Sequence, residues 1–594
     1  MPPSPLQDIE GPVRVTVKSH GTSVSERTGL ISVTVRRAIN RVPSATLVFA
    51  DGDMPTQGFA LSEMADFVPG AEIELQAGYG NEEHTIFKGI VVRQGLSIGG
   101  AYDARLTVEC RDKAVKMTVG RKNAIFRDKS DADVMSQLIG DAGLTADVQG
   151  TTPVHAELIQ HCCSDWDFML IRAEANGQLL SVEDGKVVVA VPEAAGDAVL
   201  EVKYGESLTA FQGEIDAQDQ YANVQAQAWD KKNQVLLQGA PASPARLPAQ
   251  GNLGSATLAK VLGLKTFGLQ SGAALSADAL TAWAKAQQLK SGLSRLRGSM
   301  SFQGSALAAV GKLIDLKGVG ERFSGNVLVT ALTHTIEAGD WTTQAEFGSP
   351  ASWLAERDDI LAPPAAGLVP GIKGLHVGLV VKLDGDPDQE HRIQVSVPTA
   401  GVDHVWARLM QFHASSTFGA FFLPEIGDEV VLGWFDDDPA HPVVLGSLYS
   451  AKNVPPRPLE AANNIKTIVT RCQASLTFDD ENKVITVKTP AGNVVVLSDK
   501  DKSITLTDQH GNKLELGSGG VTVDSPKDIK LSAKGSISID AVGALSLSSK
   551  DDVKIVGLNV NATAQVGLVA KGSATAELSA SGQTTVKGAM VMIN

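Results

Sequence analysis

The chain is poor in aromatic side chains and in cysteine, and it lacks a long apolar run. Aromatic residues make up 5% of the 594 residues, and the four cysteines are Cys110, Cys162, Cys163 and Cys472. They show no CxxC or zinc-ligand spacing, and adjacent cysteines rarely bridge each other, so we expect buried thiols in a reducing cytoplasm. No stretch approaches 18 uninterrupted apolar residues, so we expect no membrane-spanning segment.

A basic surface and a secretory signal are also missing. The formal net charge is −15, and residues 372–450 alone carry four basic and eleven acidic side chains, a net of −7. A nucleic acid partner is therefore not expected, because phosphates are bound by clustered Lys and Arg. The first fifteen residues have neither a basic region nor an apolar core, so we expect assembly in the cytoplasm without a signal peptide.

An eight-residue repeat dominates the C-terminus, from about Lys513 to Asn594. Two apolar columns recur at this period, with one polar residue between them in each unit. The first column is Val521, Ile529, Ile537, Leu545 and Val553, and the second is Val523, Leu531, Ile539, Leu547 and Ile555. Apolar–polar–apolar alternation indicates a half-buried strand. A third column holds Gly519, Gly535 and Gly543, where the chain would have to turn, but Lys527 and Asp551 interrupt it, so the turns are not all alike.

A strand-turn unit at so short a period predicts a stacked β-helix. In a single chain with three faces, the clear units would give only three or four coils, which is a poor core. Three chains winding together need one unit each per coil, and their shared axis becomes apolar. We therefore favour an intertwined homotrimer over residues 472–594, with the ten column residues as its core. A single-chain β-solenoid adhesin is the alternative.

The rest of the chain is expected to be mainly β, with a small α/β insertion. Alternating strands separated by Gly, Asp and Asn predict two β-barrel or sandwich bodies, and helical spacing predicts the insertion between them. In the insertion, Asp131 or Ser130 is expected to cap the first helix, Ser164 to cap the second, and Asn176-Gly177 to end it. A strand over 221–230 and a helix over 276–290 are expected in the second body. Five short strands before the repeat suit an OB-fold. The expected domains are 1–128 (barrel 1), 129–197 (insertion), 198–361 (barrel 2), 362–371 (linker), 372–450 (OB-fold), 451–471 (linker or neck) and 472–594 (spike).

Several long motifs resemble known proteins. They are FKGIVVRQ, HCCSDWDFMLIRAEANG, THTIEAGDWTTQAEFG, GLVVKLDGDPDQEHRIQVSVP and FLPEIGDEVVLGWFDDDPAHPVVLGSLYS. They are similar to the hub and OB domains of VgrG-type spike proteins of contractile injection systems, and to the late-control D proteins of contractile phages. In the hub, the chain is most similar to spikes of extracellular, antifeeding-prophage-like particles. A type VI secretion spike or a phage tail spike is the alternative.

The resemblance implies a fold and a function. Each chain would carry two barrels that imitate a tube subunit, so that a trimer presents six barrels to a hexameric inner tube. The protein would cap that tube, nucleate the baseplate and puncture the target envelope when the sheath contracts. It would meet the target membrane only transiently, as part of a phage-tail-like particle released from the cell.

Candidate chemistry is sparse. Asp384, Asp386 and Asp388 have the spacing that opens a calcium loop, but Gln389 and Val395 stand where such a loop needs Gly and Glu, so an acidic hairpin loop is favoured. Asp165 and Asp167 could do acid–base work, but helix capping is the better account. His334 is expected to be a packed strand residue. We expect no catalytic residue, metal or cofactor; a cell-wall-degrading enzyme with its site in the insertion is the second hypothesis.

The final residues are apolar and offer no metal ligands. The last histidine is His510, the last cysteine is Cys472 and the last acidic side chain is Glu577. A trimer would expose three copies of Met590, Val591, Met592 and Ile593, which is an unfavourable surface to leave in water. We therefore expect a separate PAAR-type tip protein to bind there.

Overall fold

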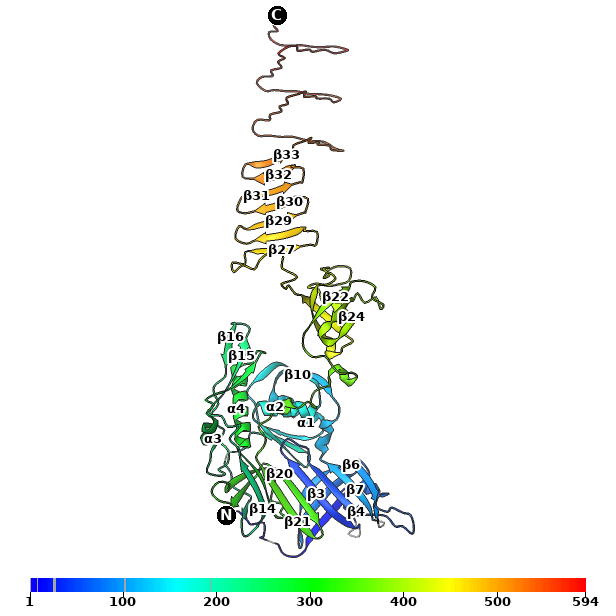
Figure 1. Ribbon diagram of the computed structural model, residues 1–594, viewed down its shortest axis with the longest axis vertical. Coiled ribbons are helices and arrows are strands. Elements are labelled where there is room, and N and C mark those ends of the chain that lie inside the picture. Colours follow the sequence, from blue (N-terminus) through cyan, green and yellow to red (C-terminus); the bar gives the residue numbers. More distant parts are fainter. Residues whose placement is uncertain (1, 8, 25–27, 101–102, 194, 594) are drawn as a thin grey trace. The chain divides into compact units, whose positions relative to one another are not determined.

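The computed structural model describes residues 2–7, 9–24, 28–100, 103–193 and 195–593 (Figure 1). The chain divides into two compact units, Met1–Leu448 and Tyr449–Asn594. In both units the regular secondary structure is mainly β-strand, as the sequence predicts. Among the described residues, no helix has the length and hydropathy needed to cross a membrane.

The first unit is organised around one 13-stranded sheet. In order across the sheet, eleven of its strands are β14 Leu208–Ile215, β18 Leu296–Gln303, β21 Asp340–Phe347, β20 Gly325–Glu337, β3 Leu30–Ala38, β4 Ser44–Ala50, β7 Ala104–Arg111, β6 Glu82–Ile98, β5 Glu72–Tyr79, β1 Val13–Ser19 and β2 Thr22–Ser23. The other two are β13 (Leu200–Lys203) and β19 (Leu313–Lys317), and β19 pairs with both β13 and β20.

The two β bodies expected from the sequence share this sheet. Each has its own buried core, one around Leu47 and Phe87 and the other around Phe302 and Val329. Strand β3 of the first body pairs with β20 of the second, with Val35 opposite His334. The sequence predicted the strands, but it carried no signal for this pairing because the partners are far apart along the chain.

The α/β insertion is present between the two bodies. Its elements are β8 Lys122–Ser130, α1 Asp131–Asp141, β9 Thr145–Val148, β10 Val154–Cys163, α2 Asp165–Ala175, β11 Leu179–Glu183 and β12 Lys186–Ala190. Ser130 caps α1 in a capping box with Asp133, and Ser164 caps α2. Gly177 follows α2 with φ of 67°, a left-handed conformation that ends the helix. The predicted caps and helix end are confirmed.

A second small α/β element lies within the second body. It contains β15 Val224–Asp230, β16 Val235–Gln238, α3 Ser255–Leu262, β17 Phe267–Ser271 and α4 Ala277–Ser294. The sequence predicted β15 and α4. It missed α3, β16 and β17, which are short and largely exposed and therefore show little hydrophobic periodicity.

The OB-fold prediction is confirmed by a closed five-stranded barrel. The strands are β22 His376–Lys382, β23 Ile393–Val397, β24 Val402–Leu409, β25 Glu429–Trp434 and β26 Pro442–Ser447. They close in the order β22-β23-β24-β26-β25, around buried side chains such as Val395, Val430 and Val444.

The second unit begins as an antiparallel meander. Its strands are β27 Ile465–Val469, β28 Ser475–Asp479, β29 Val484–Lys488, β30 Val494–Ser498, β31 Ser503–Thr507, β32 Lys513–Gly517 and β33 Gly520–Asp524. Residues 525–593 are all described, and there the chain turns back and forth without forming a strand (Figure 1). The half-buried strands expected in this stretch have no partner within their own chain, which disfavours the single-chain β-solenoid.

Candidate functional site

The meander has one continuous apolar face. Residues directly opposite on neighbouring antiparallel strands lie on the same face, as do residues two apart along a strand. Leu476 lies opposite Val487, Val487 opposite Val495, and Val495 opposite Leu506. Followed through every strand pair, this face consists of Lys466 and thirteen apolar residues: Ile468, Leu476, Phe478, Ile485, Val487, Val495, Leu497, Ile504, Leu506, Leu514, Leu516, Val521 and Val523.

The other face of the meander is mostly polar and rich in threonine. Thr467, Thr477 and Thr486 lie side by side on it, and the hydroxyls of Thr467 and Thr477 are 2.9 Å apart. Glu515 and Thr522 continue this face. A sheet with one apolar and one polar face is built to bury the apolar face against another layer.

No such layer is present in the single chain. Within the described part of Tyr449–Asn594, Ser498 is the only buried residue, so this unit has no apolar core of its own. Each Val, Leu or Ile left in water forgoes about 1.5–3 kcal/mol of burial free energy. The meander is therefore incomplete as a monomer.

The ten residues predicted as the spike core are all exposed in the single chain. Val521 and Val523 lie on β33, at the end of the apolar face, and the other eight follow in the stretch without strands. Their exposed fractions run from 54% to 75%. The predicted tip residues Met590, Val591, Met592 and Ile593 are exposed as well.

From the sequence, residues 483–516 are predicted to form a meander with a repeat of nine or ten residues, but that prediction named no residue of its apolar face. From Leu476 to Leu516, each strand contributes two apolar residues that flank one central residue, as in Ile485-Thr486-Val487. This is the same pattern as the eight-residue repeat, but its spacing is nine or ten because the turns are longer. A search for the three-residue pattern without a fixed period would have found it.

One charge interrupts the apolar face at its first strand. Lys466 lies opposite Phe478, and its ammonium forms an ion pair with Asp480. It also donates a hydrogen bond to the carbonyl of Asn463. The charge is thus at the N-terminal limit of the face, and every other member of the face is uncharged.

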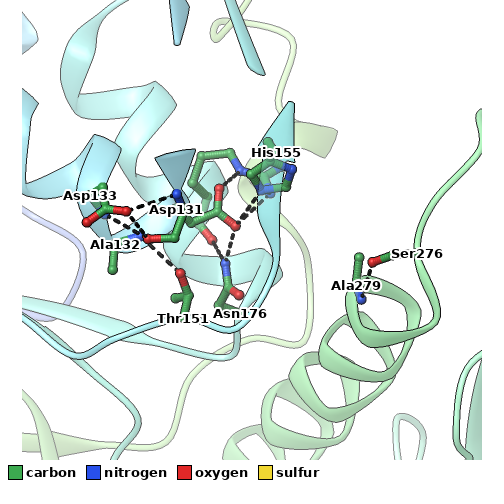
Figure 2. A network of polar contacts seen from close by, with 10 residues as sticks. Asp131, Ala132, Asp133, Thr151, His155, Asn176, Ser276 and Ala279 are labelled. Carbon is green, nitrogen blue, oxygen red and sulfur yellow. Dashed lines mark hydrogen bonds and ion pairs between the residues drawn. The ribbon is translucent and has the colours of Figure 1, made fainter. Parts of the chain in front are cut away.

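The carboxylates of the α/β insertion are held in structural contacts. Arg172 donates from Nε and Nη2 to the two oxygens of Asp131, at 2.6 and 2.9 Å, and Asn176 donates to the same carboxylate at 2.8 Å (Figure 2). His155 Nε2 lies 3.2 Å from Oδ2 of Asp131. Burial, the largest single influence, would raise the pKa of Asp131, but the charge of Arg172 and the hydrogen bonds from Arg172, Asn176 and His155 together leave that pKa below its usual value. The network ties α1, α2 and β10 together.

Asp165 and Asp167, the candidate acid–base pair, also make structural contacts. Asp167 accepts a hydrogen bond from the Ser164 hydroxyl at 2.6 Å at the start of α2, which confirms its capping role. Asp165 lies 2.5 Å from the Lys122 ammonium and accepts a hydrogen bond from the Gln160 amide at 3.0 Å.

His334 is a packed strand residue, as expected. It is buried on β20, where the Trp341 indole donates to its Nδ1 at 3.3 Å and the Thr343 hydroxyl lies 2.9 Å from the same nitrogen. Burial, with a smaller contribution from Arg37, lowers the pKa of His334 to about 3. The imidazole is therefore neutral, and its Nδ1 accepts a hydrogen bond from the Trp341 indole.

The acidic loop of the OB-fold is closed by an arginine. Asp386 accepts hydrogen bonds from the backbone amides of Asp388, Glu390 and Arg392. The Arg392 guanidinium contacts both Asp386 and Asp388, and its hydrogen bonds hold the pKa of Asp386 well below its usual range. Across the described residues, no three His, Cys, Asp or Glu side chains gather in a way that could hold a metal ion.

Family profiles match three successive parts of this architecture. The type VI secretion system/phage-baseplate injector OB domain matches residues 376–449, which form the closed barrel. The phage baseplate V C-terminal trimerisation domain matches residues 484–546, which carry most of the apolar face. The Alg8 N-terminal domain matches residues 10–338, more than half of the chain. The chain belongs to the family that this Alg8 N-terminal domain model describes, and its OB and trimerisation domains are those of a VgrG-type spike protein.

Curated relatives of this spike share short segments with it. The type VI secretion system spike protein VgrG1c of Pseudomonas aeruginosa is 27% identical over 134 residues, which is 21% of this chain and 18% of that protein. The actin cross-linking toxin VgrG1 of Vibrio cholerae is 29% identical over 96 residues, which is 15% of this chain and 9% of that protein. The matches therefore span less than a fifth of either relative.

Solved structures with similar folds include a 43 kDa tail protein of prophage MuSo2 from Shewanella oneidensis. It has a TM-score of 0.44 and 11% identity, and the match covers 57% of this chain and 99% of that one. A component of the type VI secretion system of E. coli has a TM-score of 0.38 and 11% identity, with 73% of this chain and 99% of that one covered.

Proposed function

We propose that this VgrG-type spike is the central spike of a contractile injection system. In this role a homotrimer caps the inner tube, nucleates the baseplate and punctures the target envelope when the sheath contracts. The observation that carries the proposal is the exposed apolar face that runs from Ile468 to Val523 and continues, in the same two-residue pattern, to Ile555. In the proposed trimer, the apolar faces of the three chains are buried against one another.

The proposed rod is an intertwined trimeric β-helix. Three amphipathic sheets can turn their apolar faces inward and their threonine-rich faces to water. Beyond β33, each chain would find its strand partners in the other two chains, because residues 525–593 form none alone. Val521, Val523, Ile529, Leu531, Ile537, Ile539, Leu545, Leu547, Val553 and Ile555 would then lie on a dry axis. Interlocked backbone hydrogen bonds would give a stiff rod suited to transmitting force.

The hub is proposed to present two tube-like barrels per chain. Support comes from the two separate cores that share one sheet through β3 and β20. A trimer would then offer six similar bodies, which matches the symmetry of a hexameric inner tube. Baseplate subunits would bind around this hub. The proposed domain boundaries are those expected from the sequence, with the meander from β27 onward assigned to the spike.

The proposed partner at the C-terminal end is a PAAR-type tip protein. Met590, Val591, Met592 and Ile593 are exposed, and in a trimer twelve such side chains would share one small platform. A conical cap would cover them and would carry any metal. Deleting residues 590–594 should abolish cap binding and leave the trimer intact, whereas stoichiometric iron or zinc in the cap-free spike would contradict this assignment.

The particle is proposed to be of the extracellular, antifeeding-prophage-like type. It would assemble in the cytoplasm, be released, and meet the target membrane only during firing. A type VI secretion spike and a phage tail spike are the other members of this class. Electron microscopy of particles purified from the culture medium would distinguish release from assembly inside the producing cell.

The mass of the purified full-length chain tests the central proposal. We expect a trimer at micromolar concentration, because each monomer would otherwise leave its apolar face in water. A stable monomer under these conditions would overturn the proposed rod. The proposed role needs no catalytic residue, and a peptidoglycan zymogram of the same preparation should show no clearing; clearing would support the enzyme hypothesis.

A further inference from the structure

The OB-fold carries an apolar hairpin that its barrel does not bury. Residues 410–426, between β24 and β25, form this projection, which we call the aromatic hairpin. Its two arms are joined by hydrogen bonds from the Ala420 amide to the His413 carbonyl at 2.8 Å and from the Ser415 amide to the Phe418 carbonyl at 3.0 Å. The side-chain amide of Gln411 also donates a hydrogen bond to the backbone carbonyl of Phe422 at 2.9 Å.

The aromatic hairpin places seven large apolar side chains in water. They are Met410, Phe412, Phe418, Phe421, Phe422, Leu423 and Ile426. Phe412 and Phe421 are 86% and 80% exposed, although phenylalanine is among the residues most often fully buried. A cluster of this kind on an ordered segment marks an interaction surface.

The hairpin differs from the rest of its module in charge. Within residues 410–426 the titratable side chains are His413 and Glu425, whereas residues 372–450 as a whole carry a net charge of −7. Two copies of this module repel each other through most of their surfaces. The aromatic hairpin is the face on which identical modules can approach with little charge repulsion and with apolar surface to bury.

We propose that the aromatic hairpin docks against the same hairpin of the neighbouring copies, so that the OB-folds form a second apolar contact around the trimer axis. The inference rests on the proposed trimer, because the rod tethers three OB-folds together. Tethering raises their effective concentration into the millimolar range, so a small apolar contact is populated that would not form between free modules. Phe412, Phe418 and Phe421 are the side chains exposed enough to be shared between copies.

A photo-crosslinker tests this contact in the full-length protein. A benzophenone amino acid is placed at Phe421, the purified chain is irradiated, and crosslinked peptides are identified by mass spectrometry. We expect dimers and trimers joined between the 410–426 segments of different copies. The matched control carries the same group at Asp384, which is exposed on the acidic loop of the same module, and should give no crosslinks between copies.

The outcomes separate this contact from the trimer itself. A trimer by native mass that gives no crosslink between hairpins, or crosslinks from the hairpin to the hub of another copy, would overturn the inference and leave the rod in place. A monomer would overturn both. A third arm mixes the spike with vesicles of phosphatidylcholine and phosphatidylglycerol. Co-sedimentation that Phe421→Ser abolishes would show a lipid-binding surface and contradict the proposal, whereas we expect none.

Discussion

Position within the eight-residue repeat decides whether a residue tolerates a charge. Leu545→Asp would bring three carboxylates together on the proposed dry axis, each at a cost on the order of several kcal/mol unless it is protonated. We expect this variant to lose the trimer. Ser546→Asp changes the adjacent residue, which belongs to the polar column, and should leave the trimer as stable as the wild type. Size-exclusion chromatography with light scattering measures both, and equal effects would show that the two faces are misassigned.

The buried histidine predicts a pH dependence of hub stability. The pKa of His334 is about 3 in the folded protein and about 6.5 in an unfolded chain. Its stabilising contribution is therefore complete above pH 6.5, and it declines as the pH falls toward 3, because only the unfolded chain takes up the proton. The hub should unfold at a lower temperature at pH 4.5 than at pH 7.

The control for this prediction is His334→Gln, which keeps an acceptor for Trp341 but does not titrate. It should show a smaller loss between the two pH values, measured by calorimetry. Identical pH dependence in both proteins would assign the acid sensitivity to other groups.

Single residues were predictable where their role is local. Ser164 and Asn176-Gly177 were identified as helix boundaries, and the cap of α1 as Asp131 or Ser130, because capping depends on neighbouring residues alone. The structure shows Ser130 as that cap. The roles of Arg172 and Lys122 were not foreseen. Their partners Asp131 and Asp165 lie some forty residues away in the sequence, and only the fold brings them together.

At the scale of elements, the acidic loop of the OB-fold should not respond to calcium. Asp386 and Asp388 already share the Arg392 guanidinium, so an internal cation compensates their charge. We expect the same unfolding temperature in millimolar CaCl₂ and in EDTA. Arg392→Leu removes the internal cation and should lower that temperature. A calcium-dependent rise in the wild type would contradict the closed loop.

Elements were predictable where hydrophobic periodicity is strong. The strands of the two β bodies and of the OB-fold alternate clearly between buried and exposed residues, as β21 does from Asp340 to Phe347. The meander was predicted from its repeat of nine or ten residues, but its apolar face was not, because this spacing drifts and differs from the eight-residue repeat that follows. The aromatic hairpin was missed because it has no periodicity, and exposure becomes visible only once the barrel is built.

At the scale of the whole molecule, the unfolding of the two units should depend differently on protein concentration. Met1–Leu448 contains its own buried cores, while the described part of Tyr449–Asn594 has none. The proposed rod is stabilised by contacts between copies, so its unfolding temperature should fall on dilution. The free energy of dissociating and unfolding one trimer falls by about 3 kcal/mol for each tenfold dilution. The hub transition should move much less. Calorimetry at two concentrations tests this, and a rod transition that is independent of concentration would argue for a fold within one chain.

The pairing of β3 with β20 also has a consequence for synthesis. Val35 and His334 are paired across roughly 300 residues, so the partner of β3 leaves the ribosome about 15–60 s later at typical rates. Throughout that interval the first body presents an open strand edge, the kind of edge that templates aggregation. Until the second body is complete, the open edge of one nascent chain must therefore not pair with the identical edges of other chains made on the same messenger RNA. Once the C-terminus has emerged, the same chains are the partners with which the trimer forms.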